Sequence, residues 1–535
     1  MKLASYKIIL LAMASLLLTS CGGGSSSPPP PPPSGPDPLL ADQWHLLNTG
    51  QLGAKAGEDM DVEPAWVAGV KGTGVRIAIV DDGLEIGHED LSSNIAIGQS
   101  YNYVTGSSDP TNDAADLTAG HGTSCAGIAA ARDLNGLGGS GVAPRASLVG
   151  YNLLQNSTTT NEADAMTRNA ASVGVSSNSW GAADGTGELD TRSISWKTAI
   201  DSGLSTGRGT KGTVYTWAAG NGAGVNGSAA CPNWQCIDNS NYDGRANYRG
   251  VMAIAAVNDQ GVRSSYSELG ANLWVSAPGG EFCSSHAITT TDRSGNLGFN
   301  KTGASPDYDN TKLSYTRCMN GTSSATPGAA GVVALMLEAN PSLGWRDVRI
   351  ILAKTARKND ASDTGWALTG GTTQYWFNHK YGFGVVDAAV AVTEALAYTS
   401  YVGTELTYTA SHSSLAKSIP DNDLVTGVSD TINILSSGIS SIEFVEVSFT
   451  ATNTPYSGDL KVTLTSPSNT VSTLAETHFC SGTNGACTST YNGWVFGSAR
   501  HLGEAADGAW TLKVYDGFLG GTGTFTSWQL KFYGN

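Results

Sequence analysis

The stretch Asn320-Gly-Thr-Ser-Ser-Ala-Thr-Pro327 runs directly into a long apolar segment of small residues, and no other segment of this chain is as informative. Its glycine favours a sharp turn, and the segment that follows favours a helix with a proline in its first turn. The hydroxyl of Ser323 would then lie among the unpaired N–H groups at the positive end of the helix dipole. These groups can stabilise an oxyanion, so Ser323 is the candidate nucleophile.

A serine nucleophile needs a base, and the base needs an acid that orients it. The chain offers His121, in His121-Gly-Thr-Ser-Cys125, and Asp81, in Ile79-Val-Asp-Asp-Gly83. Each segment alone is also typical of an ordinary turn or loop, but together, in the order Asp, His, Ser, they match the triad order of subtilisin. The chain therefore resembles the subtilisin-like serine proteases, and the doubled Asp81-Asp82 is similar to their kexin/furin-like branch.

The composition indicates a large globular protein with an acidic surface. The chain has 535 residues, of which 40% are apolar and 14% charged, so it can bury a large core and form at least two domains. Its net charge of −16 argues against binding to nucleic acid or to an anionic membrane surface. The same charge suits cationic substrates and Ca²⁺, although it would also keep any exported protein soluble.

The N-terminus reads as an export signal. Lys2 and Lys7 precede an apolar run, and residues 1–20 end before Cys21 in a Leu-Thr-Ser-Cys sequence that resembles a bacterial lipobox. Cys21 would then carry the lipid; the alternative is an ordinary signal peptide and a secreted protein. Residues 21–36 form a Gly/Ser/Pro tether, which is extended and buries nothing. Gly22 resembles signals for the outer membrane of Gram-negative bacteria, so we expect a lipid-anchored protein of the cell envelope, with no other membrane contact.

Residues 37–400 show an α/β pattern, in which short β-branched runs alternate with alanine-rich stretches. Helices are expected after Gly122, over residues 160–172 and after Thr322. The expected strands are residues 75–80, 147–153, 173–177, 213–218, 251–257 and 273–276. This order predicts a subtilisin-like parallel sheet covered by helices on both faces, with Asp81 at the carboxyl end of its strand.

Residues 401–535 change to strict two-residue alternation, as in Val445, Val447 and Phe449 or Trp510, Leu512 and Val514. Such alternation predicts half-buried antiparallel strands of a jelly-roll-like β-sandwich. Segments such as Gly458-Asp-Leu460 resemble the P domain that follows the catalytic domain in kexin-like proteases. From the pattern alone, a sugar-binding or adhesive sandwich is equally compatible.

The resemblance assigns roles to individual residues. Ser323 would attack the scissile carbonyl, His121 would act as general base and acid, and Asp81 would hold the imidazole. The start of a helix at His121 would favour its neutral form. Asn221, between two glycines after an expected strand, matches the side-chain donor of the oxyanion hole, although a plain Gly-Asn-Gly turn is the alternative.

Substrate specificity would come from acidic residues near the cleft. Asp184 and Asp243 match family residues that line a P1 pocket for arginine or lysine, where a carboxylate binds the cationic side chain. Asp82 matches an acid that favours a basic P2 residue, and Asp190 an acid further along the cleft. The second P2 acid of the family is Thr118 here, which makes selectivity at P2 weaker than at P1. Any of these acids could also be a solvated surface carboxylate.

The resemblance also implies two Ca²⁺ sites, because clustered carboxylates repel one another without a cation. The side chains of the first are Asp37, Asp90 and Asn135, helped by the carbonyls of Arg132, Leu137 and Gly139. Those of the second are Asp184, Asp238 and Glu268. Asn102 stands where a further site would need aspartate, so the resemblance leaves a third site open.

Six cysteines can pair in an oxidising compartment. The pairs suggested are Cys231–Cys236, Cys283–Cys318 and Cys480–Cys487, among fifteen connectivities that six cysteines allow. Cys125 lies one helical turn beyond His121 and resembles the unpaired cysteine of the family, so we expect a packed free thiol.

The catalytic region is expected to follow the tether directly, without the folding propeptide usual in the family. We therefore expect folding to be unassisted or helped by a separate chaperone protein. The leading hypothesis is a monomeric, calcium-dependent serine endoprotease that cleaves peptide or protein substrates after basic residues. The alternatives are a subtilisin-like protease of broad specificity and an inactive surface adhesin.

Overall fold

The computed structural model describes residues 35–223, 237–283, 286–304, 311–400, 402–452, 456–482 and 485–535. From Ser34 onward the chain folds as one compact unit. The export signal with Cys21, nearly all of the tether and the suggested pair Cys231–Cys236 lie outside the described residues, so these calls stay predictions. Among the described residues, none of the helices combines the length and the apolar character that crossing a bilayer requires.

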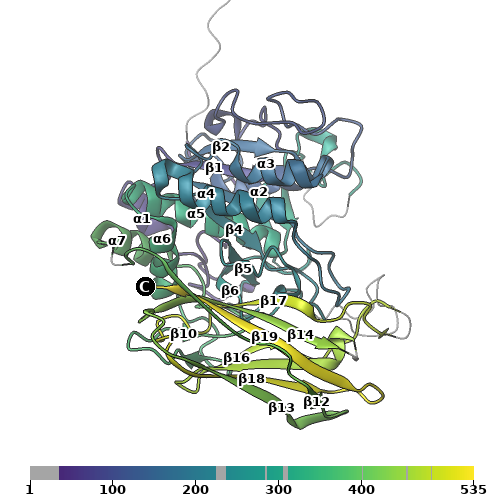
Figure 1. The fold of residues 1–535 in the computed structure, drawn as a ribbon. Coiled ribbons are helices and arrows are strands. Elements are labelled where there is room, and N and C mark those ends of the chain that lie inside the picture. The colour runs from purple at the N-terminus through teal and green to yellow at the C-terminus, as the bar shows by residue number, and fades with distance from the viewer. Residues whose placement is uncertain are drawn as a thin grey trace, which may run out of the picture. The chain divides into compact units, whose positions relative to one another are not determined.

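A parallel β-sheet forms the centre of the α/β part, with the order β2-β1-β3-β4-β5-β6 (Figure 1). Its strands are β1 (Arg76–Val80), β2 (Ser147–Tyr151), β3 (Val175–Asn178), β4 (Val214–Ala218), β5 (Met252–Val257) and β6 (Leu273–Pro278). Both faces are buried, because Ile77 and Ile79 of β1 join one apolar core while Ala78 and Val80 join another. The predicted parallel sheet is confirmed.

Helices cover both faces of this sheet. One core contains residues of α2 (His121–Ala130) and α5 (Thr322–Ala339), and the other contains residues of α3 (Thr159–Thr167) and α4 (Ile194–Thr210). The pattern analysis missed α4, and α3 ends five residues earlier than expected. The remaining α-helices and short strands are α1 (Glu63–Val67), α6 (Trp345–Thr355), α7 (Ala388–Ala397), β7 (Ile288–Thr291), β8 (Tyr315–Met319), β9 (Ala367–Leu368) and β10 (Trp376–Phe377).

The C-terminal strands form two antiparallel sheets, as the two-residue alternation predicted. One has the order β11-β19-β14-β17, with β12 also on β19, and the other has the order β13-β18-β15-β16. Their bounds are β11 (Leu406–His412), β12 (Lys417–Ile419), β13 (Asp423–Ile434), β14 (Ile442–Thr452), β15 (Leu460–Thr465), β16 (Val471–Ala475), β17 (Asn492–Ser498), β18 (Gly508–Asp516) and β19 (Gly523–Gly534). Inward residues of both sheets, such as Val447 and Leu512, share one apolar core, as expected of a sandwich.

Candidate active site

The three predicted triad residues lie at the starts of two helices and the end of one strand. Asp81 directly follows β1, His121 is the first residue of α2, and Ser323 is the second residue of α5. The carboxyl ends of parallel strands are where ligands bind in open α/β sheets. The end of β1 therefore places Asp81 at the edge of the sheet where a ligand would bind, and His121 and Ser323 each lie in the first turn of a helix.

Asp81 and His121 form a direct pair. The Nδ1 atom of His121 lies 2.8 Å from Oδ1 of Asp81, whose side chain is almost fully buried. A neutral imidazole that donates from Nδ1 to a carboxylate keeps Nε2 free to accept a proton. Burial lowers the pKa of His121, but the charges of Asp81 and Cys125 and the hydrogen bonds to both together hold that pKa well above its usual value. These neighbours therefore oppose the expected preference of the helix start for the neutral ring.

Ser323 is held to the segment after β3 by two hydrogen bonds. Its hydroxyl donates to the carbonyl oxygen of Ser179 over 3.4 Å, and the hydroxyl of Ser179 donates to the carbonyl oxygen of Ser323 over 3.0 Å. The second bond has a local cause. Pro327 lies in the second turn of α5, not in the first as the sequence suggested, and it has no N–H for the carbonyl four residues earlier. Ser179 was not singled out by sequence reasoning.

Cys125 connects the base to the nucleophile segment. Its sulfur lies 3.8 Å from Nδ1 of His121, and its thiol donates to the carbonyl oxygen of Ser323 over 3.5 Å. The residue is a free cysteine with no solvent exposure, and burial raises the pKa of its thiol. Cys125 is thus a packed thiol that contacts both catalytic segments. Its burial and raised pKa make it a poor nucleophile.

The carboxamide of Asn221 is fixed at the start of α5. Its Oδ1 accepts hydrogen bonds from the backbone N–H of Thr322 at 2.8 Å and from the Thr322 hydroxyl at 2.9 Å. Its Nδ2 lies 3.4 Å from Oδ2 of Asp184. Asn221 therefore lies beside the residue that precedes Ser323, with its N–H₂ group available to a ligand or to Asp184. Thr322 is a further anchor that the sequence did not reveal.

Asp82 caps the N-terminus of α2. Its Oδ2 accepts from the N–H of Gly120 at 2.8 Å and of His121 at 3.1 Å, while its Oδ1 accepts from the N–H of Gly122 at 2.8 Å. A carboxylate in this position satisfies the orphan N–H groups of the helix and holds its first residue in place. The structure thus gives Asp82 a positioning role for His121, and its predicted contact with a P2 residue stays a prediction.

The remaining acids of the predicted cleft differ in their burial and in their hydrogen-bond and ion-pair partners. Asp243 is buried, accepts from the N–H groups of Ala182 at 2.9 Å and Arg245 at 2.7 Å, and has its pKa raised by burial. Asp190 lies 3.1 Å from the guanidinium of Arg245, which partly neutralises it. Asp184 is exposed and accepts from the N–H of Asn221 at 2.8 Å. Asp184 and Asp243 are therefore better placed than Asp190 to meet a cation.

Three carboxylates converge behind Asn221, as the sequence predicted for a cation site. Asp238 accepts from the backbone of Gly185 and Gly187, and Glu268 accepts from the N–H of Gly222 at 3.0 Å. Burial, together with the charge of Asp184, raises the pKa of Asp238 to about 6. Burial, followed by the charges of Asp238 and Asp184, holds the pKa of Glu268 well above its usual value. Buried carboxylates that raise one another's pKa fit a divalent cation.

The side chains of the other predicted cation site also lie together, whereas the predicted role of the Arg132, Leu137 and Gly139 carbonyls stays a prediction. Nδ2 of Asn135 donates to Asp90 over 2.7 Å, and its backbone N–H donates to Asp37 over 3.1 Å. Gly139 N–H lies 3.2 Å from Oδ2 of Asp90, Arg132 N–H lies 2.9 Å from the Asp90 carbonyl, and Leu137 N–H lies 2.9 Å from Oδ1 of Asn135. Burial raises the pKa of Asp90 to about 7, and Asp37 adds to the shift. The oxygen-rich donor set fits Ca²⁺.

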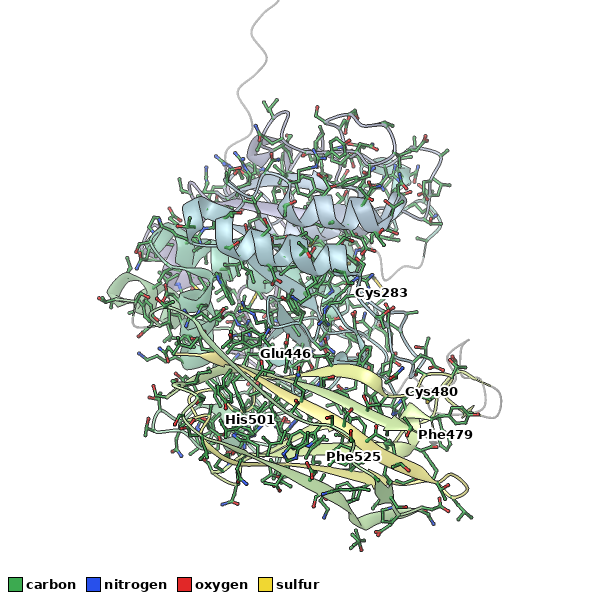
Figure 2. The ribbon with its side chains drawn as sticks, in the orientation of Figure 1. Cys283, Glu446, Phe479, Cys480, His501 and Phe525 are labelled. Carbon is green, nitrogen blue, oxygen red and sulfur yellow. A yellow bond between two sulfur atoms is a disulfide. The ribbon has the colours of Figure 1, made fainter. Side chains whose placement is uncertain are left out.

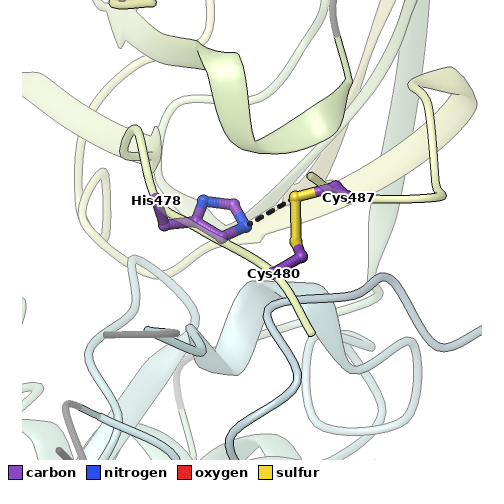
Figure 3. Close-up of side chains that lie close together, drawn as sticks. All are labelled: His478, Cys480 and Cys487. Atoms are coloured by element: carbon purple, nitrogen blue, oxygen red, sulfur yellow. Dashed lines mark hydrogen bonds between the residues drawn. A yellow bond between two sulfur atoms is a disulfide. The ribbon is translucent and has the colours of Figure 1, made fainter. Parts of the chain in front are cut away.

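The β-sandwich contacts the loop that contains Asp184 through His478. Figure 3 shows His478 beside the disulfide Cys480–Cys487, with Nε2 of His478 3.9 Å from the sulfur of Cys487. The same Nε2 lies 2.8 Å from the carbonyl oxygen of Gly187, and the ring stacks on Tyr242 at 4.8 Å. This pairing and Cys283–Cys318 are both confirmed, and Figure 2 labels one cysteine of each.

A second contact supports the same loop. The carboxylate of Glu188 accepts hydrogen bonds from the N–H of Thr488 at 2.7 Å and from the N–H and hydroxyl of Ser489 at 3.0 and 2.6 Å. Residues 185–188 thus lie between Asp238 on one side and His478, Thr488 and Ser489 of the sandwich on the other. This contact could not be predicted from local sequence patterns, because Glu188 and Thr488 are 300 residues apart.

A cavity of about 230 Å³ adjoins the base. It is lined by His121, Phe299, Thr316, Cys318, Met319 and Asn320. A larger cavity of about 620 Å³ lies elsewhere, against Trp345, Tyr248 and Tyr533, and contains none of the predicted site residues. The chemistry of the triad, not cavity size, therefore identifies the candidate site.

Comparison with known proteins gives matches over both parts of the chain. The subtilase family model matches residues 72–384, and the proprotein convertase P-domain model matches residues 442–532. Furin-like protease 2 of Drosophila melanogaster is 33% identical over 93% of this chain, which spans 28% of that protein. Human neuroendocrine convertase 2 is 30% identical over 93% of this chain and 74% of its own length.

Bacterial proteins match as well. The extracellular serine protease of Aeromonas sobria is 37% identical over 67% of this chain, and the match spans 64% of that protein. The crystal structure of the A. sobria serine protease in complex with a chaperone superposes with a TM-score of 0.82 at 30% identity, covering 94% of this chain and 95% of that one. The chain thus spans less than two thirds of the length of several of the relatives it matches.

Proposed function

Because this chain belongs to the subtilase family and carries a proprotein convertase P domain, we propose that it is a serine endoprotease. The observation that supports this most directly is the 2.8 Å pair of Asp81 and His121, together with the position of Ser323 in the first turn of α5. Cys125, which touches both His121 and the Ser323 carbonyl, ties these two segments together. The subtilase match over residues 72–384, which contain Asp81, His121 and Ser323, supports the same proposal.

In the proposed mechanism, Oγ of Ser323 attacks the scissile carbonyl while Nε2 of His121 takes its proton and later delivers it to the leaving amine. Asp81 stabilises the imidazolium that forms in between, which its effect on the pKa of His121 supports. The oxyanion would accept hydrogen bonds from the backbone N–H of Ser323 and from Nδ2 of Asn221. Loss of such a side-chain donor costs about 3 kcal/mol of transition-state stabilisation.

For the substrate we propose a peptide or protein with arginine or lysine at P1. Asp243 is buried beside Gly181, where a side chain would collide with its carboxylate, and Asp184 is exposed next to Asn221. An apolar P1 side chain would leave these carboxylates without a partner. We propose no strict requirement for a basic P2 residue, since Asp82 is occupied with α2 and Asp190 with Arg245.

We propose that Ca²⁺ binds at both clusters described above. Asp184, Asp238 and Glu268 would hold one ion and Asp37, Asp90 and Asn135 the other. The cation would neutralise carboxylates that otherwise repel one another and would keep the loop of Asp184 in place. The hydrogen bonds from Gly185 and Gly187 to Asp238 would also hold this loop, and with it Asp184.

We further propose that the mature protein is held in the cell envelope by a lipid on Cys21 and that a separate protein assists its folding. The lipobox-like sequence supports the first proposal. The similarity to a protease whose structure was determined together with a chaperone supports the second. Labelling with palmitate that disappears in Cys21→Ser would support the anchor, and unlabelled protein would refute it.

Two experiments test the activity itself. A fluorophosphonate probe should label the protein and fail to label Ser323→Ala; labelling of both would refute the nucleophile, and labelling of neither would favour a non-enzymatic adhesin. A peptide panel that differs only at P1 should then show preference for arginine and lysine. Equal cleavage after leucine and phenylalanine would instead identify a protease of broad specificity.

A further inference from the structure

Three aspartates lie around one turn at one end of the β-sandwich, and none of them belongs to the triad, the cleft acids or the two cation clusters described above. Asp516 is the last residue of β18, Asp459 directly precedes β15, and Asp421 lies two residues before β13. The turn after β18 joins them, because the N–H of Gly517 donates to the carbonyl oxygen of Asp459 over 2.9 Å and the N–H of Gly520 donates to Oδ1 of Asp421 over 3.0 Å. Three strand ends thus bring three carboxylates to one turn.

Asp516 is buried without a full set of partners. Its side chain has no solvent exposure; Oδ1 accepts from the N–H of Phe518 at 3.1 Å, but Oδ2 is buried and has no hydrogen-bond partner. A buried carboxylate oxygen without a partner is costly unless a ligand binds it. Burial, together with the charges of Asp459 and Asp421, raises the pKa of Asp516 to about 6, so this carboxylate lies near other negative charge.

The other two aspartates lie nearer the surface, Asp459 half-buried and Asp421 exposed. Asp459 accepts one backbone hydrogen bond, from Tyr456 at 3.0 Å on Oδ2, and Asp421 accepts the one from Gly520 on Oδ1. Within the described part of the chain, none of the three forms an ion pair with lysine, arginine or histidine. Each carboxylate therefore has one oxygen that accepts no hydrogen bond from the described residues, and a cation would suit three such oxygens.

We propose that Asp516, Asp459 and Asp421 bind a Ca²⁺ ion that ties together the ends of β13, β15 and β18. The donors are all oxygen, without histidine or cysteine, which suits a hard cation and not zinc or copper. The ion would satisfy Oδ2 of Asp516 and remove the repulsion among the three carboxylates. This site is separate from the two clusters of the α/β part, and it does not depend on the proposed protease activity.

The first test counts bound ions. The full chain and three variants are dialysed to equilibrium against radioactive Ca²⁺ at neutral pH. Asp516→Asn should bind one ion fewer per molecule than the unchanged chain. The matched control Asp507→Asn should bind the same number, because Asp507 is an acid of the same sandwich whose carboxylate accepts from the N–H of Ser436 and Ser437. Equal binding by the unchanged chain and Asp516→Asn would overturn the proposal.

The variant Asp421→Asn tests the same site without a change in the core, because Asp421 is exposed. It therefore remains informative if Asp516→Asn fails to fold. It should keep the fold and weaken this one site by at least about tenfold, the scale on which even the outer partners of metal ligands act. If Asp516→Asn does not fold, the result for Asp421→Asn decides: unchanged affinity at every site would overturn the proposal.

The second test uses stability instead of ion counting. In a chelator, Asp516→Asn should melt at or above the temperature of the unchanged chain, because the amide removes one of three repelling charges. With Ca²⁺ added, the order should reverse. The cation clusters of the α/β part are present in both proteins, so they do not change the comparison. The same difference in Tm with and without Ca²⁺ would show that Asp516 is a structural residue only.

Discussion

The hydroxyl of Ser179 donates a hydrogen bond to the carbonyl oxygen of Ser323 over 3.0 Å, and the carbonyl of Ser179 lies 3.4 Å from the Ser323 hydroxyl. These two residues are 144 positions apart. The contact replaces the helix hydrogen bond that Pro327 cannot make, and it joins the end of β3 to the start of α5. The position of the nucleophile therefore depends on a residue outside the triad.

Replacing Ser179 by alanine should impair both stability and catalysis. The buried carbonyl of Ser323 would keep only the weak thiol donor of Cys125, and an unsatisfied buried group costs about 1–3 kcal/mol. We expect a lower Tm and a lower kcat with little change in KM. Ser205→Ala, at an exposed position of α4, is the control. A normal kcat in Ser179→Ala would show that α5 holds Ser323 without this contact.

Replacing Asp81 by asparagine should lower kcat by about 10⁴-fold, because the amide no longer fixes the tautomer of His121. Activity requires the neutral imidazole, so it rises as the pH passes the pKa of His121. Asp81 raises that pKa, and its loss should move the acidic limb of the residual activity to lower pH. The measurement is kcat/KM against pH for both proteins; an unmoved limb would assign it to another group.

Mercurial compounds should inhibit the protein through Cys125, since the bulky adduct would lie between His121 and the Ser323 carbonyl. Iodoacetamide should react slowly at neutral pH, because burial raises the pKa of the thiol and little thiolate is present. Cys125→Ala should remain active and resist mercurials. Inhibition that persists in this variant would contradict the explanation.

Replacing His478 by alanine should weaken substrate binding more than catalysis. The variant loses the hydrogen bond to the Gly187 carbonyl and the ring that stacks on Tyr242, so the loop of Asp184 becomes less constrained. We expect a higher KM for substrates with arginine at P1 and a smaller change in kcat. His412→Ala is the matched control, because His412 pairs with Asp430 inside the sandwich. Equal effects in both variants would indicate general destabilisation.

Removal of Ca²⁺ should lower Tm, because the carboxylates of Asp184, Asp238 and Glu268 would then repel one another in a buried site. Glu268→Gln should reduce the Ca²⁺-dependent rise in Tm, whereas Glu394→Gln, which only loses a surface pair with Lys354, should not. A Tm that is insensitive to a chelator in the unchanged chain would argue against both cation sites of the α/β part.

Several features could be predicted because their signal is local. The strands of the central sheet are continuous apolar runs, and the sandwich strands alternate with a period of two, so burial on two faces or on one is visible in the sequence. Helix α4 was missed because its glycines and polar residues obscure the helical period. Pro327 was placed in the wrong turn because helix ends are hard to locate to within a few residues.

The sequence by itself determined which residue types occur at the ends of strands and the starts of helices, and therefore the three residues of the triad and the two-part fold. Only the tertiary structure decided that Asp82 caps α2, that Ser179 holds Ser323, and that Asp516 is buried facing Asp459 and Asp421. The reason is physical. Periodicity and turn chemistry act over a few neighbouring residues, whereas hydrogen bonds, burial and charge repulsion depend on partners that the folded chain brings from distant positions.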